Sequence, residues 1–130
     1  MFLYKVKQIA KSLFRYPKIQ IGAGYDRYWE TRGLGLGLNS FQKTRADLIL
    51  KLAESGSSLL DIGGGNGRIL NYLKTHGNFT QLINVDVSKD ALNIARKNGI
   101  EVIRGDISDP EMVANLPEVD YTLLLEVIEH

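Results

Sequence analysis

The chain has 130 residues, of which 44% are hydrophobic and 24% charged, a globular composition that suits one domain and excludes a disordered or collagen-like chain. It contains no cysteine, which excludes disulfide bonds, a thiolate nucleophile and cysteine-ligated zinc. The net charge of +1 is unevenly spread, because residues 1–20 carry five bases and no acid while the other 110 residues hold 11 bases and 15 acids. This larger, acidic part is a poor general binder of nucleic acids.

Residues 1–20 are the first predicted unit, an amphipathic basic helix. Apolar side chains recur at helical spacing from Phe2 to Phe14, bases occupy another face, and Pro17 limits the length. We interpret the segment as a packing helix with a solvated basic face; peripheral contact with a membrane and closure over a binding site stay open as alternatives. No apolar run approaches the roughly 18 residues of a membrane span and no signal-peptide pattern opens the chain, so we expect a cytoplasmic protein.

Residues 21–40 form a glycine-rich connection. Glycine alternates with leucine over residues 33–37, a pattern that suits a loop better than a strand. Tyr25 and Arg27 lie in the same segment. Aromatic and arginine side chains in a long loop indicate a binding segment.

Residues 41–130 form the third unit, in which helices and strands alternate regularly. Helices are expected at about 41–54, at 68–74, from the Ser88 cap to about 98 and after Asp109-Pro110, and strands at 58–62, 81–87, 100–104 and from 119 towards 127. Strands separated by single helices form a parallel sheet that helices cover on both faces. The expected fold class is therefore α/β.

The most informative segment is LLDIGGGNGR, residues 59–68, where an apolar strand leads through glycines directly into a helix. Glycine lets a ligand approach the backbone, and the helix N-terminus that follows offers unpaired N–H groups. The dinucleotide pattern G-x-G-x-x-G fails, because the sixth position from Gly63 is Arg68. The spacing present is D-x-G-x-G-x-G, from Asp61 to Gly67.

This spacing resembles the first motif of the class I S-adenosylmethionine-dependent methyltransferases. The segments Tyr-Trp-Glu-x-Arg-Gly, Leu-Asn-Ser-Phe-Gln and Gly-Ile-Glu-Val-Ile-Arg-Gly-Asp look like the MetW-like, methyltransferase type 11 branch. The final Glu-Val-Ile-Glu-His is similar to methyltransferases of ubiquinone and methionine biosynthesis, so the resemblance covers about residues 25–130. It implies a Rossmann-like sheet of seven strands in the order 3-2-1-4-5-7-6. We expect strands one to four of that sheet here, the N-terminal half of the fold, in a sequence truncated after the fourth strand.

The resemblance implies S-adenosylmethionine as cofactor and assigns its contacts. Asp86, at the tip of the second strand, takes the ribose hydroxyls, although an acid there would serve NAD equally well. Asp106 and Ile107 hold the adenine, and the Gly63 carbonyl accepts from the cofactor ammonium. The implied cofactor-binding residues are Asp61, Gly63, Gly65, Asn66, Gly67, Asp86, Val87, Asp106, Ile107 and Glu126, with Tyr25 and Arg27 reaching the cofactor carboxylate.

The implied reaction is methyl transfer to a small-molecule acceptor. Glu129 and His130 are the candidates for the base that removes a proton from that acceptor. In a helical turn they share one face with Glu126, a set that suits Mg²⁺, Mn²⁺ or Zn²⁺. We favour cofactor-adjacent residues without metal, because a stable site wants more than three protein ligands at a chain end.

Two other functional classes stay open beside the enzyme. A non-catalytic half-domain that binds S-adenosylmethionine is one. An NAD-dependent oxidoreductase is the other, which shares Asp86 but fails the glycine spacing.

If the sheet ends at its fourth strand, residues 121–125 present unpaired backbone groups, and we expect dimerisation through this edge, aggregation or a continuation that covers it.

Overall fold

The computed structural model of the chain describes residues 37–125. The elements in this range are helices α3 (Ser40–Leu52), α4 (Arg68–His76), α5 (Lys89–Lys97) and α6 (Pro110–Ala114) and strands β1 (Ser57–Ile62), β2 (Phe79–Asp86), β3 (Glu101–Arg104) and β4 (Tyr121–Leu123). The predicted helix over residues 1–20, the connection up to residue 36 and the segment 126–130 lie outside the described residues.

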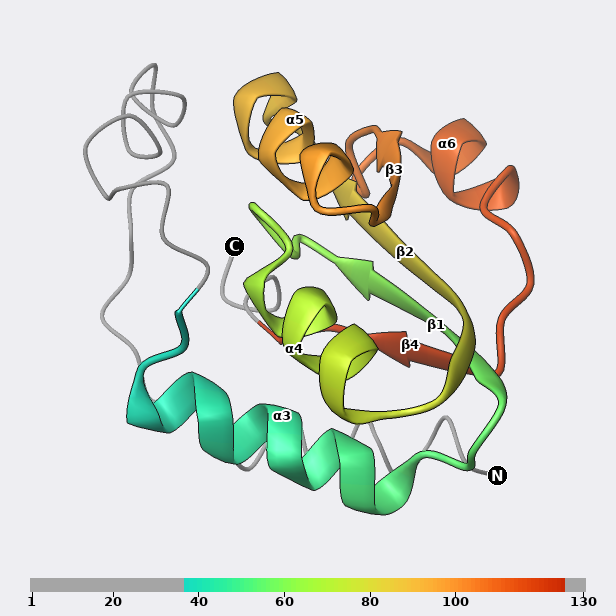
Figure 1. Cartoon of the computed structure of the whole chain (residues 1–130). Coiled ribbons are helices and arrows are strands. Elements are labelled where there is room, and N and C mark those ends of the chain that lie inside the picture. Colours follow the sequence, from blue (N-terminus) through green and yellow to red (C-terminus); the bar gives the residue numbers. More distant parts are fainter. Residues whose placement is uncertain (1–36, 126–130) are drawn as a thin grey trace.

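The four strands form one parallel sheet in the order β3-β2-β1-β4, as the resemblance implies for the first four strands of the fold (Figure 1). The central pair is in register from Leu59↔Leu82 to Ile62↔Val85, after an irregularity at Ser57 and Ser58. Because every pairing is parallel, all four strands end at the same edge of the sheet. β4 is an outer strand among the described ones, and dimerisation through it stays a prediction.

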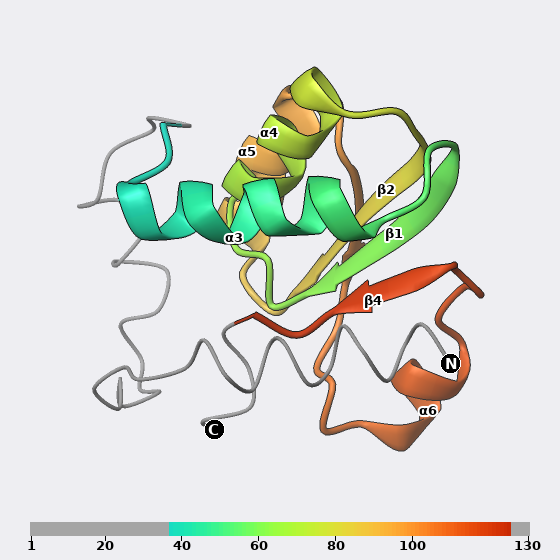
Figure 2. The same cartoon turned by 90° about the horizontal axis from the view of Figure 1, so that it is seen from below.

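The alternation of side chains along the strands divides the core into two layers. Leu59 of β1 and Leu123 of β4 face α3, α4 and α5, whereas Leu60 of β1 and Ile83 of β2 face α6. Figure 2 shows α3, α4 and α5 on one side of the sheet and α6 on the other. Helices therefore cover both faces, as the sequence predicts.

Side-chain caps set the beginnings of three helices. Asn39 closes a capping box with Gln42, in which each side chain accepts a hydrogen bond from the backbone N–H of the other. Ser88 caps α5 by accepting from the N–H of Ala91, and Asp109 caps α6 directly before its first-turn proline.

Among residues 37–125, no helix has the length and apolar content needed to cross a membrane.

The limits of several elements differ from the prediction, and α4, for example, ends at His76 rather than at 74. β2 begins at Phe79 and ends at Asp86, rather than running from 81 to 87. α3 ends at Leu52, because Ala53 adopts extended backbone angles. β4 begins at Tyr121 rather than 119, since the side chain of the preceding Asp120 bonds to Ser58 of β1 in place of a strand ladder.

The contribution of Asp120 to stability can be tested by varying the pH. Its Oδ2 accepts from the N–H and the Oγ of Ser58, at 2.8 and 3.0 Å, and the backbone bond is the first cause that holds the pKa of Asp120 below its usual value. A carboxyl whose pKa is lowered by folding stabilises the fold above its unfolded pKa, and this contribution is lost as pH falls through the folded pKa. We expect Asp120→Asn to lower Tm at pH 7, by a margin that narrows below about pH 4.

Thermal unfolding between pH 2.5 and 7 measures this margin. Glu118→Gln, which removes an exposed charge two residues earlier, is the control and should change Tm much less at pH 7. If Asp120→Asn lowers Tm by the same amount at every pH down to 2.5, the charge of Asp120 is not the cause of the stabilisation.

Candidate functional site

The carboxyl ends of the strands bring three separate segments of the chain to one edge of the sheet. The loops that follow β1 and β3 begin in register with β2, because the Gly63 N–H donates to the Val85 carbonyl at 2.7 Å and the Gly105 N–H to the Asp86 carbonyl at 3.1 Å. Open α/β sheets bind ligands at this edge. The glycine loop, the tip of β2 and the loop after β3 are therefore neighbours here, although they are far apart in sequence.

The loop between β1 and α4 needs its glycines for two different reasons. Gly63, Gly65 and Gly67 have φ angles of +73°, +58° and +77°, in the left-handed region that favours glycine. Gly64 is needed for space, since a Cβ there would lie 2.4 Å from Asn84 Oδ1 and 2.7 Å from Asp61 Oδ2. The loop consequently presents bare backbone at the edge of the sheet.

A cluster of three buried polar side chains lies against this loop. Asp61 of β1 pairs in register with Asn84 of β2, and Asp86 follows two residues later on the same face of β2. Their exposed fractions are 2%, 0% and 4%. Buried polar groups of this kind require partners, and the loop supplies several of them.

Asp86 binds the backbone on two sides. Its Oδ2 accepts from the Gly65 N–H and its Oδ1 from the Ser88 N–H, both at 2.9 Å. Ser88 itself caps α5, so Asp86 supports the cap residue rather than acting as the cap. A carboxylate offers about four acceptor positions in total, so contacts to the backbone and to hydroxyl groups of a ligand are chemically compatible.

Asn84 is a member of this buried cluster that the sequence did not lead us to predict. Its Nδ2 donates to the Gly65 carbonyl at 2.7 Å, while Asp86 accepts from the N–H of the same glycine. One signal in the sequence could have found it, because Asn84 is a polar residue between the apolar Ile83 and Val85 near the end of a strand. A polar residue at such a buried position indicates a specific partner.

Two apolar side chains are exposed at the same edge. Val87, directly after β2, is 48% exposed, and Ile107, after β3, is 37% exposed. A hydrogen bond of 3.2 Å from Nε of Arg104, the last residue of β3, to the Val87 carbonyl connects the ends of the two strands. Asp106 is exposed beside Ile107, and a bond from the Ser108 N–H is the first cause that lowers the pKa of Asp106.

Asn66 contributes a buried donor at the start of α4. The residue is 2% exposed, and its Nδ2 makes no hydrogen bond in the part of the chain that the structure describes. The next residue, Gly67, is the helix N-cap and has no side chain to satisfy the first N–H groups. Desolvation of an unpaired donor has a free-energy cost, which a ligand with acceptor oxygens would offset.

The other predicted site residues lie outside the described residues. They are Tyr25, Arg27, Glu126, Glu129 and His130. Within residues 37–125, no group of three or more His, Cys, Asp or Glu side chains could hold a metal ion. The hypothesis of a metal at residues 126–130, and the preference against it, therefore stay untested.

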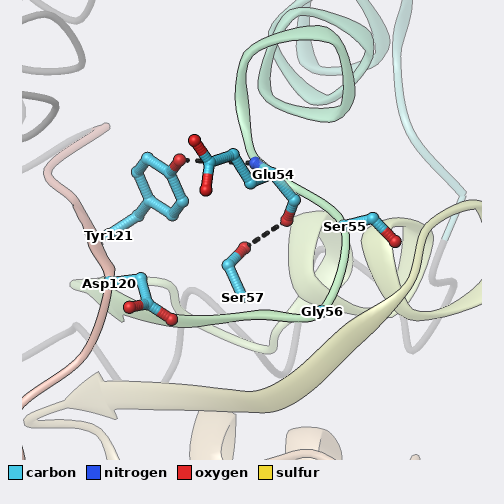
Figure 3. A pocket seen from close by; sticks show the side chains of 6 residues that line it. All are labelled: Glu54, Ser55, Gly56, Ser57, Asp120 and Tyr121. Carbon is cyan, nitrogen blue, oxygen red and sulfur yellow. Dashed lines mark hydrogen bonds between the residues drawn. The ribbon is translucent and has the colours of Figure 1, made fainter.

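A pocket of about 270 Å³ lies at the opposite edge of the sheet (Figure 3). It is formed where α3 leads into β1 and where β4 begins. The Tyr121 hydroxyl accepts from the Glu54 N–H at 3.3 Å, and the Ser57 hydroxyl donates to the Glu54 carbonyl at 2.7 Å. No predicted site residue lines this pocket.

A family model, "Methionine biosynthesis protein MetW", matches residues 43–129, which include the glycine loop, the buried cluster and all four strands. The chain belongs to the MetW family. A search of curated proteins found no match.

Solved structures share the fold of this MetW family member. The chain is similar to a putative RNA methyltransferase, PH1948, from Pyrococcus horikoshii, with 21% identity and a TM-score of 0.55, over 91% of this chain and 56% of that one. It is also similar to PH0226 from the same organism, with 21% identity, a TM-score of 0.54 and 78% and 50% covered.

A third similar structure is a putative S-adenosyl-L-methionine-dependent methyltransferase, mmp1179, from Methanococcus maripaludis. The identity is 19%, the TM-score 0.52, and the match covers 74% of this chain and 47% of that one. The described part of the chain has the class I methyltransferase fold, and the chain spans about half the length of these three structures.

Proposed function

We propose that this chain forms the cofactor-binding half of an S-adenosylmethionine-dependent methyltransferase. The observation that carries the proposal is the glycine loop, in which three left-handed glycines at alternate positions leave bare backbone beside the carboxylate of Asp86. Gly67, the last of these glycines, is the N-cap of α4, and α4 itself contains no glycine. A dinucleotide site differs here, because it uses its third glycine for close packing of the helix against the strand.

The amino-acid end of the cofactor is proposed to lie on the glycine loop. The Gly63 carbonyl accepts from its ammonium group, and Asp61 adds negative potential. The buried Nδ2 of Asn66 and the first N–H groups of α4 donate to its carboxylate, which supplies the acceptor that Asn66 lacks in the described part of the chain. Tyr25 and Arg27 are proposed to complete this end.

The adenosine end is proposed to lie across the tips of β2 and β3. Asp86 accepts from the ribose hydroxyls while it holds the loop. The exposed side chains of Val87 and Ile107 provide apolar surface for the adenine ring. Asp106 accepts from the adenine amino group, and the backbone N–H of Ile107 donates to the ring.

The chemistry of the proposed reaction belongs largely to the cofactor, which supplies an electrophilic methyl group on sulfur. The protein has to orient a small-molecule acceptor in line with that methyl group and to exclude water. Glu129 or His130 is proposed as the base that removes a proton from the acceptor.

Calorimetric titration of the whole chain with S-adenosylhomocysteine and with NAD tests the proposal. We expect S-adenosylhomocysteine to bind and NAD to bind at least about a hundredfold more weakly, because the loop lacks the third glycine of a dinucleotide site, which permits close packing of the helix against the strand. Adenosine, which lacks the amino-acid end, should bind more weakly than S-adenosylhomocysteine. Binding of NAD without any response to S-adenosylhomocysteine overturns the proposal in favour of an oxidoreductase.

A further inference from the structure

We infer that Asn84 is a positioning residue of this site, which holds Gly65 in the orientation that its N–H needs to reach Asp86. The inference rests on the proposed function of the glycine loop. It adds a residue that lies outside the D-x-G-x-G-x-G motif and outside every residue assigned to the cofactor above.

The geometry places Gly65 between two side chains of one strand. Asn84 Nδ2 donates to the Gly65 carbonyl at 2.7 Å, and Asp86 Oδ2 accepts from the Gly65 N–H at 2.9 Å. Asn84 and Asp86 are two residues apart on β2, so their side chains leave the same face of the sheet. Together they fix the two peptide units on either side of the Gly65 Cα, which has a φ of +58° and no Cβ to restrict rotation.

The burial of Asn84 indicates that stability alone does not account for it. The residue is 0% exposed, and its Oδ1 makes no hydrogen bond within the described residues. A half-satisfied buried amide is less favourable than an apolar side chain of similar volume, such as its neighbours Ile83 and Val85. What the amide provides here is a donor that restrains the Gly65 carbonyl.

Loss of that donor should release the loop without unfolding the sheet. The Gly65 carbonyl would lose its partner, and the two peptide units could rotate about the glycine. The N–H of Gly65 would then meet Asp86 for only part of the time, which leaves the carboxylate less well oriented for a ribose. Asn84 therefore acts on the ligand through Gly65 and Asp86 rather than by touching it.

The variant Asn84→Asp separates positioning from packing, because the introduced carboxyl is nearly isosteric and can donate to the Gly65 carbonyl only when it is protonated. Burial beside Asp61 of β1 and Asp86 of β2, the ionisable groups of the cluster, raises the pKa of the introduced carboxyl. We expect affinity for S-adenosylhomocysteine to fall at least about tenfold at pH 8 and to recover towards pH 5.5. The same titrations on the wild-type chain correct for all other ionisable groups.

Asn78 supplies the matched control. It directly precedes β2 at the opposite edge of the sheet, and its Nδ2 donates to Ser55 Oγ at 3.0 Å in an exposed position. Asn78→Asp should bind S-adenosylhomocysteine as the wild-type chain does at both pH values. Wild-type affinity of Asn84→Asp at pH 8 overturns the inference, and so does an equal loss at every pH in a folded variant.

A second variant and a second measurement cover the remaining outcomes. If Asn84→Asp does not fold, Asn84→Ala decides, with an expected loss of about tenfold in affinity. Hydrogen exchange of the Gly65 amide in the ligand-free chain should be at least about tenfold faster in Asn84→Ala, and an unchanged rate overturns the inference. This measurement needs no ligand, so it tests the role of Asn84 independently of the proposed function. Failure of the wild-type chain to bind S-adenosylhomocysteine would refute the proposed function alone.

Discussion

Substitution Asp86→Ala is expected to weaken binding of S-adenosylhomocysteine about ten- to a hundredfold, which corresponds to about 1.5–3 kcal/mol. The carboxylate is the proposed acceptor for the ribose hydroxyls, and charge-assisted hydrogen bonds of this kind are the strong ones. The structure adds a second cause, because Asp86 also accepts from the N–H groups of Gly65 and Ser88. Alanine would leave both donors without this partner, so the loop and the beginning of α5 lose support together.

Calorimetric titration and thermal unfolding separate the two causes. Asp86→Asn keeps the shape and one acceptor oxygen, so we expect it to retain more stability than Asp86→Ala while still binding the ligand weakly. Asp90→Ala, which removes an exposed acid from the first turn of α5, is the control and should bind the ligand normally. Wild-type affinity of Asp86→Ala would remove Asp86 from the ribose site.

Gly64→Ala is the second substitution with a large expected effect. A Cβ at this position would lie 2.4 Å from Asn84 Oδ1 and 2.7 Å from Asp61 Oδ2. Both oxygens belong to buried side chains on the central strands, so the loop must move instead. We expect a loss of about 1–3 kcal/mol in the free energy of unfolding, a Tm lower by several degrees and a loss of ligand binding.

Gly37→Ala is the matched control for this prediction. Like Gly64, Gly37 has no left-handed φ, but no atom of the described residues lies within 4 Å of a Cβ built there. The pair therefore isolates steric overlap from backbone strain, and Gly37→Ala should leave Tm and affinity unchanged. If Gly64→Ala behaves in the same way, the loop relaxes freely and its close contact with the buried cluster has no role in binding.

The sequence by itself determined the order of the elements between residues 37 and 125 and several of their ends. Ser88 and Asp109 cap their helices as predicted, because a cap depends on a side chain and an N–H group within one turn of each other. The parallel sheet with helices on both faces followed from the alternation of single strands and helices. Asp86 could be placed at the tip of β2 from the local sequence as well, because the apolar run of that strand leads directly to it.

Only the tertiary structure decided how the site residues meet. Asn84 and Gly65 are 19 residues apart, and their contact depends on the register between β1 and β2, which no local pattern specifies. Arg45 was predicted only as part of a helix, yet it is 1% exposed, with its guanidinium 4.1 Å from the centre of the Phe41 ring. β4 begins later than its apolar run predicts, because a contact from Asp120 to Ser58 replaces the ladder before Tyr121. Local sequence signals act within one turn or one strand, whereas burial, register and close approach arise only when distant segments pack together.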